Sequence, residues 1–233
     1  MIIGSGLLAN AFSDAFSDVN DLIIYAAGVS NSNCNDESEF SRERTRLSQT
    51  LRKSSKMGTF VYFGTCSVSD PLAINTPYVQ HKLSMEKMVY AHPNNLIFRL
   101  PQVAGNTPNP HTLLNFLHAR IIRSEKFNLW RNAKRNVIDV DDIVAIALKL
   151  IADNSLRNTT INIANKINYK MIEIVETMEQ VLRKHAVYDV IENGSEYNID
   201  INCISSVLDD AQVQFDDGYL KNVIFKYYGC NPK

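Results

Sequence analysis

A tyrosine and a lysine one helical turn apart are the residues with the clearest chemical potential in this sequence. In Tyr78-Val-Gln-His-Lys82 the spacing places the phenol and the ammonium on the same helix face. We expect Lys82 to lower the pKa of Tyr78 toward the working range of a general acid or base, because a nearby cation favours the phenolate. The spacing is weak evidence alone. His81 points to a different helix face, and we expect it to be a solvent-facing or packing residue rather than a catalytic one.

Hydroxyl side chains follow a run of residues typical of a buried strand. Phe60-Val-Tyr-Phe63 continues into Gly64-Thr65-Cys66-Ser67. Ligands of parallel sheets bind at the carboxyl ends of the strands. These hydroxyl groups are therefore expected in a ligand site. Their position supports the interpretation of Tyr78 and Lys82, which follow soon after in the sequence, as catalytic residues.

A glycine-containing turn follows the first apolar residues. Gly4-Ser5-Gly6-Leu7-Leu8-Ala9 has the pattern GxGxxA between a short strand and an amphipathic helix. Such a turn lets the backbone approach a pyrophosphate, which the helix N-terminus stabilises. The alternative is a tight strand–helix connection without a ligand. The acidic residue that usually follows at the end of a second strand is absent, and Ala26-Ala27-Gly28 occupies that place.

Short apolar runs alternate with helix-like stretches, which predicts an α/β fold with a parallel sheet and flanking helices. The strands are expected at Met1–Ile3, Leu22–Ala26, Thr59–Phe63, Asn95–Arg99, Val137–Val140 and Thr160–Ala164. The helices are expected at Leu7–Phe16, Glu37–Lys53, Pro77–Ala91, Pro110–Arg123, Asp141–Ala152 and Tyr169–Lys184. Arg42, Arg44 and Arg46 lie on the second of these helices and are expected on a solvated face. A softer boundary follows Gly105, where Asn-Thr-Pro-Asn-Pro interrupts the pattern.

Composition describes an ordinary globular protein. The 233 residues include 24 basic and 25 acidic side chains and are 45% hydrophobic, which excludes a disordered chain. A net charge of -1 gives no general attraction for nucleic acid, and no apolar run is long enough to cross a membrane. We therefore expect the protein to bind neither nucleic acid nor a membrane and to be cytoplasmic. Cys34, Cys66, Cys203 and Cys230 form no CxxC pair, so neither disulfides nor a metal site are expected.

These motifs together resemble the extended branch of the short-chain dehydrogenase/reductase superfamily, the NAD-dependent epimerase/dehydratase family, and in pattern its nucleotide-sugar 4-ketoreductases most closely. The resemblance covers nearly the whole chain. The segments that carry it follow the family's order: Gly4-Ser-Gly-Leu-Leu-Ala9, Leu22-Ile-Ile-Tyr-Ala-Ala-Gly-Val-Ser30, Val61-Tyr-Phe-Gly-Thr65-Cys-Ser-Val68, Tyr78 with Lys82, Phe98-Arg-Leu-Pro-Gln-Val-Ala-Gly105, Arg135-Asn-Val-Ile-Asp-Val-Asp-Asp142 and Asn162-Ile-Ala164.

The resemblance implies three groups of site residues and NADP or NAD as cofactor. Thr65, Tyr78 and Lys82 would be catalytic. The cofactor would contact Gly4, Ser5, Gly6, Leu7, Leu8, Ala26, Ala27, Gly28, Lys82, Pro101 and Val103. A nucleotide-sugar substrate would contact Thr65, Cys66, Ser67, Tyr78, Asn106, Trp130 and Arg135. For Trp130, a purely structural role is an equal alternative.

The chain departs from the family in one large respect. About fifteen residues separate Ala9 from the Ala-Ala-Gly segment, so the second and third strands of a full dinucleotide-binding unit are expected to be absent. We expect a Rossmann-like sheet shortened in its cofactor half over residues 1–105. Residues 106–233 would form a small substrate-binding lobe, interleaved with the last strand and helix of the sheet.

The reaction implied is NAD(P)H-dependent reduction of a nucleotide-linked 4-keto-6-deoxy sugar, in nucleotide-sugar metabolism and polysaccharide biosynthesis. Dehydratases of the family carry Asp-Glu after the active-site Thr, whereas Cys66 and Ser67 stand here. A nucleotide-sugar epimerase is an alternative, although it would need a complete cofactor site. A non-catalytic NAD(P)-binding sensor or interaction protein is the other. The helices Glu37–Lys53 and Pro77–Ala91 resemble the family's dimerisation pair, so a homodimer is expected.

Overall fold

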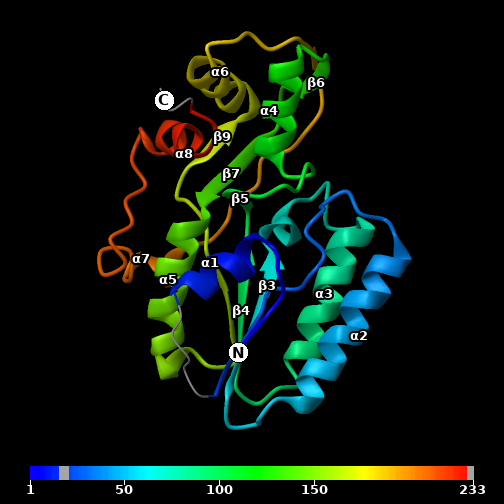
Figure 1. Cartoon of the computed structure of the whole chain (residues 1–233), viewed down its shortest axis with the longest axis vertical. Coiled ribbons are helices and arrows are strands. Elements are labelled where there is room, and N and C mark those ends of the chain that lie inside the picture. Colours follow the sequence, from blue (N-terminus) through cyan, green and yellow to red (C-terminus); the bar gives the residue numbers. More distant parts are fainter. Residues whose placement is uncertain (16–20, 230–233) are drawn as a thin grey trace.

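Five parallel strands form the central sheet of the computed structural model, which describes residues 1–15 and 21–229 (Figure 1). In sheet order the strands are β1 (Ile2–Ile3), β2 (Leu22–Tyr25), β3 (Thr59–Thr65), β4 (Asn95–Leu100) and β8 (Thr159–Asn162). All neighbouring strands pair in parallel. Their carboxyl ends therefore meet at one edge of the sheet. This confirms the predicted α/β class.

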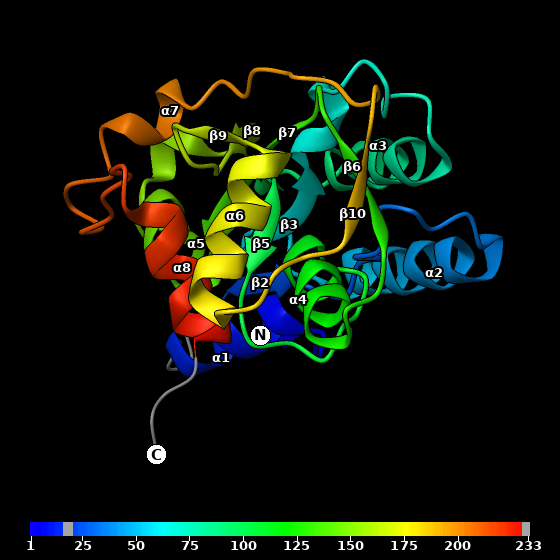
Figure 2. The same cartoon turned by 90° about the horizontal axis from the view of Figure 1, so that it is seen from above.

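Helices cover both faces of this sheet. The eight helices of the described residues are α1 (Leu7–Ala15), α2 (Glu37–Lys53), α3 (Pro77–Val89), α4 (Leu113–Arg123), α5 (Val140–Ala152), α6 (Met171–Leu182), α7 (Asn202–Ser205) and α8 (Tyr219–Tyr228). Phe12 of α1 and Ile146 of α5 belong to one buried apolar cluster. Leu47 of α2 and Met85 of α3 belong to another. Thus α1 and α5 lie on one face and α2 and α3 on the other (Figures 1 and 2).

Strand β1 stands at one end of the sheet. Among the described residues it pairs only with β2. Residues 16–21, which connect α1 to β2, are too few for a further helix and strand. The sheet is therefore short on the side where a full dinucleotide-binding unit continues, as the sequence predicts.

Smaller elements lie beyond the carboxyl ends of the central strands (Figure 1). They comprise a three-stranded sheet of β5 (Gln102–Ala104), β7 (Lys134–Asp139) and β9 (Asn168–Lys170), and a parallel pair of β6 (Phe127–Trp130) and β10 (Tyr188–Ile191). Helices α4, α6 and α8 pack with them. The strand β9 runs antiparallel to β7, unlike the central strands. The domain boundary at residue 105 stays a prediction.

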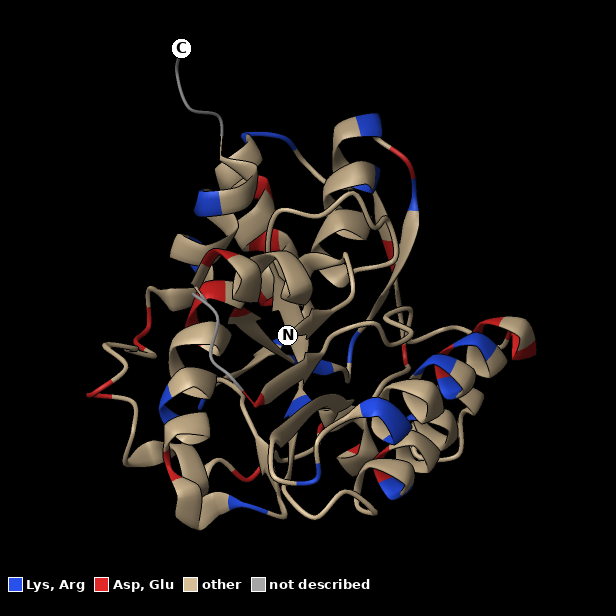
Figure 3. Ribbon diagram, turned by 60° about the horizontal axis from the view of Figure 1, so that its bottom comes forward, with Lys and Arg blue, Asp and Glu red and all other residues tan. Residues whose placement is uncertain are grey.

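Local sequence explains the two helices that frame the site. Asp36 caps α2 by accepting a hydrogen bond from Ser38, and the helix has acidic residues in its first turn and basic ones in its last, as the helix dipole favours. The Glu residues of α2 all lie in its first half, and after Glu43 its charged residues are only Arg and Lys (Figure 3). Thr76 caps α3 and Pro77 occupies its first turn. This cap fixes the start of the helix that carries Tyr78 and Lys82.

The predicted elements are present, with shifted ends. Helix α4 begins at Leu113, because Thr112 rather than Asn109 or Pro110 caps it. Phe16, predicted to end the first helix, and Cys230 lie outside the described residues. Cys34 and Cys66 are buried free thiols and Cys203 is an exposed one. Within residues 1–15 and 21–229, none of the helices combines the length and apolar character needed to span a bilayer.

Candidate active site

Thr65, Tyr78 and Lys82 come together where β3 ends and α3 begins. All three are buried. The backbone leaves β3 at Thr65 and enters a short 3-10 turn, η1 (Cys66–Ser69), whose start is capped by the Thr65 hydroxyl accepting from the Ser67 amide at 3.1 Å. A side-chain hydrogen bond also joins Thr65 to Tyr78. The three predicted catalytic residues therefore form one cluster.

A pocket of about 410 Å³ connects this cluster to the glycine turn. Every residue predicted to contact the cofactor lines it: Gly4, Ser5, Gly6, Leu7, Leu8, Ala26, Ala27, Gly28, Lys82, Pro101 and Val103. Thr65, Ser67 and Tyr78 line the same pocket. The carboxyl ends of four strands thus contribute to a single space, which leads from the N-terminus of α1 to Tyr78.

The two glycines of the turn have different tasks. Gly4 has a φ of 134°, and a Cβ there would lie 2.4 Å from the Ala26 carbonyl oxygen, so the fold itself requires a glycine. A Cβ at Gly6 would have no heavy atom within 4 Å. The room beside Gly6 therefore belongs to the pocket, next to the helix N-terminus that favours an anion. This geometry fits the pyrophosphate of a dinucleotide.

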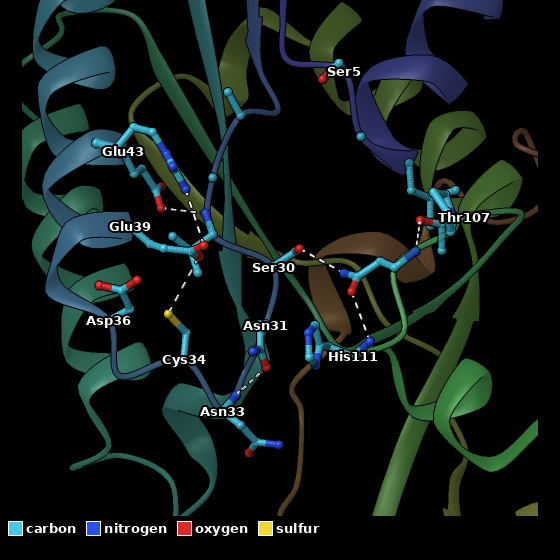
Figure 4. A pocket seen from close by; sticks show the side chains of 18 of the residues that line it. Ser5, Ser30, Asn31, Asn33, Cys34, Asp36, Glu39, Glu43, Thr107 and His111 are labelled. Carbon is cyan, nitrogen blue, oxygen red and sulfur yellow. Dashed lines mark hydrogen bonds and ion pairs between the residues drawn. The ribbon is translucent and has the colours of Figure 1, made fainter. Parts of the chain in front are cut away.

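A second pocket, of about 640 Å³, adjoins the first (Figure 4). The segment after β2, helix α2 and the 106–111 segment form its walls, and Asn109 Nδ2 donates to Ser30 Oγ across it at 3.1 Å. Arg42 and Arg46 line both pockets, although they are exposed as predicted. Their side chains therefore border a ligand-sized space as well as solvent.

The predicted substrate residues are only partly brought together. Asn106 lines the second pocket. Cys66 is buried, its Sγ donates to the Arg99 carbonyl at 3.3 Å, and burial raises the pKa of its thiol to about 12. Trp130 and Arg135 line neither pocket; the Arg135 guanidinium lies 6.0 Å from the Trp130 ring.

Tyr197 is a neighbour of the site that the sequence does not reveal. Its phenol forms a side-chain hydrogen bond with Ser67 and lies near the Arg135 guanidinium. Next to it, Ser195 Oγ and Asp70 Oδ1 are hydrogen bonded at 2.6 Å. The segment that follows β10 thus crosses the η1 turn. No periodic pattern marks this segment, so nothing in the sequence predicts its contacts with the site.

The prediction that Lys82 lowers the pKa of Tyr78 is wrong for this structure. Burial raises the pKa of the Tyr78 phenol above its ordinary value, and the hydrogen bond from Thr65 offsets this only in part. The Lys82 ammonium instead lies 3.5 Å from the carboxylate of Glu43. Its charge is therefore compensated within the protein, and Tyr78 is a neutral phenol at neutral pH.

Glu43 is the most important residue that the sequence analysis missed. It is buried on α2, on the stripe formed by Phe40 and Leu47. An acidic residue at a core position of an amphipathic helix is a signal that could have found it. His81 is also buried, with Nε2 2.9 Å from Glu43, so it is not solvent-facing. Among the described residues, no group of His, Cys, Asp and Glu side chains is arranged to hold a metal ion.

A glycine turn that opens a helix of a parallel sheet, and a Thr, Tyr and Lys cluster on the same pocket, define a dinucleotide-binding protein of the short-chain dehydrogenase/reductase class. The sequence model of the NAD dependent epimerase/dehydratase family matches residues 6–164. The chain belongs to this family. The family's dependence on NAD agrees with the predicted NADP or NAD cofactor.

Solved structures share the fold. RMD from Pseudomonas aeruginosa, complexed with NADPH, has a TM-score of 0.68 at 15% identity, covering 95% of this chain and 85% of its own. UDP-glucuronic acid 4-epimerase from Bacillus cereus, with UDP-glucuronic acid and NAD, has a TM-score of 0.68 at 16% identity, covering 93% and 75%. dTDP-glucose 4,6-dehydratase from Bacillus anthracis, with NAD, has a TM-score of 0.67 at 17% identity, covering 88% and 72%. The comparison with curated proteins finds no match.

Proposed function

We propose that the protein reduces the keto group of a nucleotide-linked 4-keto-6-deoxy sugar with NADPH or NADH. The observation that supports this most is the neutral Tyr78 beside Thr65, in the pocket that the glycine turn lines. Reduction of a ketone needs a proton donor at the carbonyl oxygen, and a protonated phenol is such a donor at neutral pH. RMD, solved with NADPH, and the two nucleotide-sugar enzymes share the fold.

Each residue of the cluster has a defined task in this reaction. When bound, NADPH or NADH would supply the hydride for the carbonyl carbon. Tyr78 donates its phenolic proton to the carbonyl oxygen, and the Thr65 hydroxyl donates a hydrogen bond to the same oxygen. Such donors stabilise charge that develops at the transition state, by roughly 2–4 kcal/mol each. Lys82, by resemblance to the family, holds the ribose beside the nicotinamide.

The residues after Thr65 argue against dehydration. Elimination of water needs an acid and a base beside the sugar, and Cys66 and Ser67 stand there. The Cys66 thiol is neutral, because burial raises its pKa to about 12, and it donates to a backbone carbonyl. An epimerase must retain its cofactor through two half-reactions. The open cofactor half suits a reductase, which exchanges its cofactor at every turnover.

A panel assay tests the proposal. The protein is mixed with NADPH or NADH and several nucleotide-linked 4-keto sugars, and the absorbance of the reduced cofactor is followed. We expect oxidation of the cofactor with at least one sugar, and no oxidation with any of them would contradict the proposal. Tyr78→Phe should lose turnover and keep cofactor binding. Tyr169→Phe, at a buried tyrosine outside both pockets, is the matched control and should keep turnover.

If the protein is instead a non-catalytic sensor, the wild type and Tyr78→Phe should both bind the cofactor and neither should show turnover. A homodimer formed through α2 and α3, which lie side by side, and a cytoplasmic location in polysaccharide biosynthesis are part of the same proposal. Light scattering at the mass of a single chain would contradict the dimer.

A further inference from the structure

We propose that Glu43 is a positioning residue of the active site, whose carboxylate neutralises the Lys82 ammonium and joins it to the turn that follows β2. The inference rests on the proposed function in one point, because it explains why Tyr78 acts as a proton donor. It is carried by the buried contacts of Glu43 and by the space around Gly28.

Both carboxylate oxygens of Glu43 are fully engaged. Oε2 accepts a hydrogen bond from the Val29 amide at 2.7 Å and lies 2.9 Å from His81 Nε2. Oε1 accepts from the Tyr62 hydroxyl at 2.8 Å and lies 3.5 Å from Lys82 Nζ. The four partners come from the turn after β2, from β3 and from α3. One side chain of α2 therefore fixes three other parts of the site relative to one another.

The Glu43 carboxylate faces the Lys82 ammonium inside this cluster. His81 Nδ1 is buried and has no hydrogen-bond partner among the described residues, whereas His81 Nε2 faces Glu43. Burial alone would raise the pKa of Glu43, but Lys82 and the hydrogen bonds lower it to about 2. One negative carboxylate thus faces one positive ammonium. Removing one partner of such a buried ion pair strongly destabilises the folded protein, because the remaining charge is left buried without compensation.

The turn after β2 is shaped around this pair. A Cβ at Gly28 would lie 2.6 Å from Lys82 Nζ and 2.9 Å from Glu43 Oε1. Gly28 is one of the residues predicted to contact the cofactor, and the next residue, Val29, is held by the same carboxylate. A displacement of Glu43 would therefore move the lysine and the pocket wall together.

The consequence for Tyr78 is electrostatic. The titratable groups that act on its phenol are Glu43 from α2, Cys34 from the preceding segment, and Tyr62 and Cys66 from β3 and η1. Lys82 on its own helix and Arg42 and Arg46 from α2 line the same pocket. Lys82 is the cation nearest in sequence, one helical turn away, and Glu43 compensates it. Without that compensation the ammonium would favour the phenolate. Glu43 therefore adds to the effect of burial, which is the larger of the two, in keeping Tyr78 protonated.

A spectroscopic titration tests this without substrate or cofactor. The ultraviolet absorbance of tyrosinate is followed against pH in the wild type and Tyr78→Phe, and again in Glu43→Gln and Glu43→Gln/Tyr78→Phe. The difference within each pair isolates Tyr78. We expect its midpoint to fall by about one pH unit or more in Glu43→Gln, the effect of an uncompensated neighbouring charge. An unchanged or higher midpoint would overturn the proposal, whatever the panel assay gives.

Two further variants are controls for this titration. Glu86→Gln removes another buried carboxylate, which pairs with Arg99 at 2.6 Å, and should leave the Tyr78 midpoint unchanged. Glu43→Gln/Lys82→Gln removes both charges and should restore the midpoint. If Glu43→Gln does not fold but this double variant does, the charge pairing is supported. If neither folds, Glu43 serves folding alone and the proposal is wrong.

Discussion

Replacing Gly6 by alanine separates a ligand site from a mere strand–helix connection. The new methyl group would meet no protein atom within 4 Å, and the φ of Gly6 is outside the left-handed region. The backbone therefore accepts alanine without strain. A compatible Gly→Ala change restricts the unfolded chain and stabilises a protein by about 0.4–1 kcal/mol. For a chain of this size that corresponds to a rise in Tm of about 1–4 °C.

The same methyl group projects into the pocket where we place the pyrophosphate. If the cofactor backbone lies against Gly6, the methyl group takes its room, and we expect the Kd for NADPH or NADH to rise at least about tenfold, or about 1.4 kcal/mol. Stability and binding should therefore change in opposite directions. Gly4→Ala is the contrasting variant: a Cβ 2.4 Å from the Ala26 oxygen at positive φ should lower Tm.

Thermal unfolding without ligand and a fluorescence titration with the reduced cofactor measure the two effects. A Gly6→Ala protein that binds both cofactors with wild-type affinity would refute the reasoning. The turn would then be only a tight connection between β1 and α1.

Two other outcomes follow from the cluster around Lys82. In Gly28→Ala the lysine ammonium must move by about 0.8 Å, from 2.6 Å to ordinary contact at 3.4 Å from the new Cβ, and the Glu43 oxygen at 2.9 Å must move as well. We expect kcat to fall by about 100-fold, because Lys82 leaves its place in the site. An unchanged kcat would show that the place of Lys82 is not critical. Glu43 has its pKa lowered from 4.5 to about 2, so its ionised form stabilises the folded state above pH 4.5, and this contribution is lost as the pH falls toward 2. Urea unfolding across that range should show a steep loss in the wild type and a flatter one in Glu43→Gln, and equal slopes would contradict the assignment.

The sequence predicts the framework of the site because each part is a local signal. The GxGxxA turn, the strand that ends at Thr65 and the Tyr78/Lys82 spacing each depend on a few neighbouring residues, and parallel strands bring them to one edge. The partner of Lys82 was not predictable in the same way. Glu43 lies 39 positions from Lys82, and only tertiary packing places its carboxylate there. The direction of the Tyr78 pKa shift depends first on the burial of its phenol and then on the Glu43 charge, and both come from tertiary packing, which explains why the prediction was wrong.

The elements after residue 185 were missed for a related reason. Strand β10 has exposed residues at Asp189 and Val190 and shows no alternation of apolar and polar side chains. Its pairing with β6 stabilises it, and that contact is not local. The contacts of Tyr197 depend on the path of the chain after this pair.

The position of α1 gives the short sheet an uncommon chirality. Both β1–α1–β2 and β3–α3–β4 join adjacent parallel strands and advance in the same direction across the sheet, yet α1 and α3 lie on opposite faces. The two crossovers must therefore have opposite hands. About 98% of such crossovers are right-handed, so one of these two has the rare left hand. A full dinucleotide-binding unit has further strands beyond β1, and a crossover through α1 toward those strands would have the usual hand. The position of α1 is therefore the one expected in a sheet that extends beyond β1.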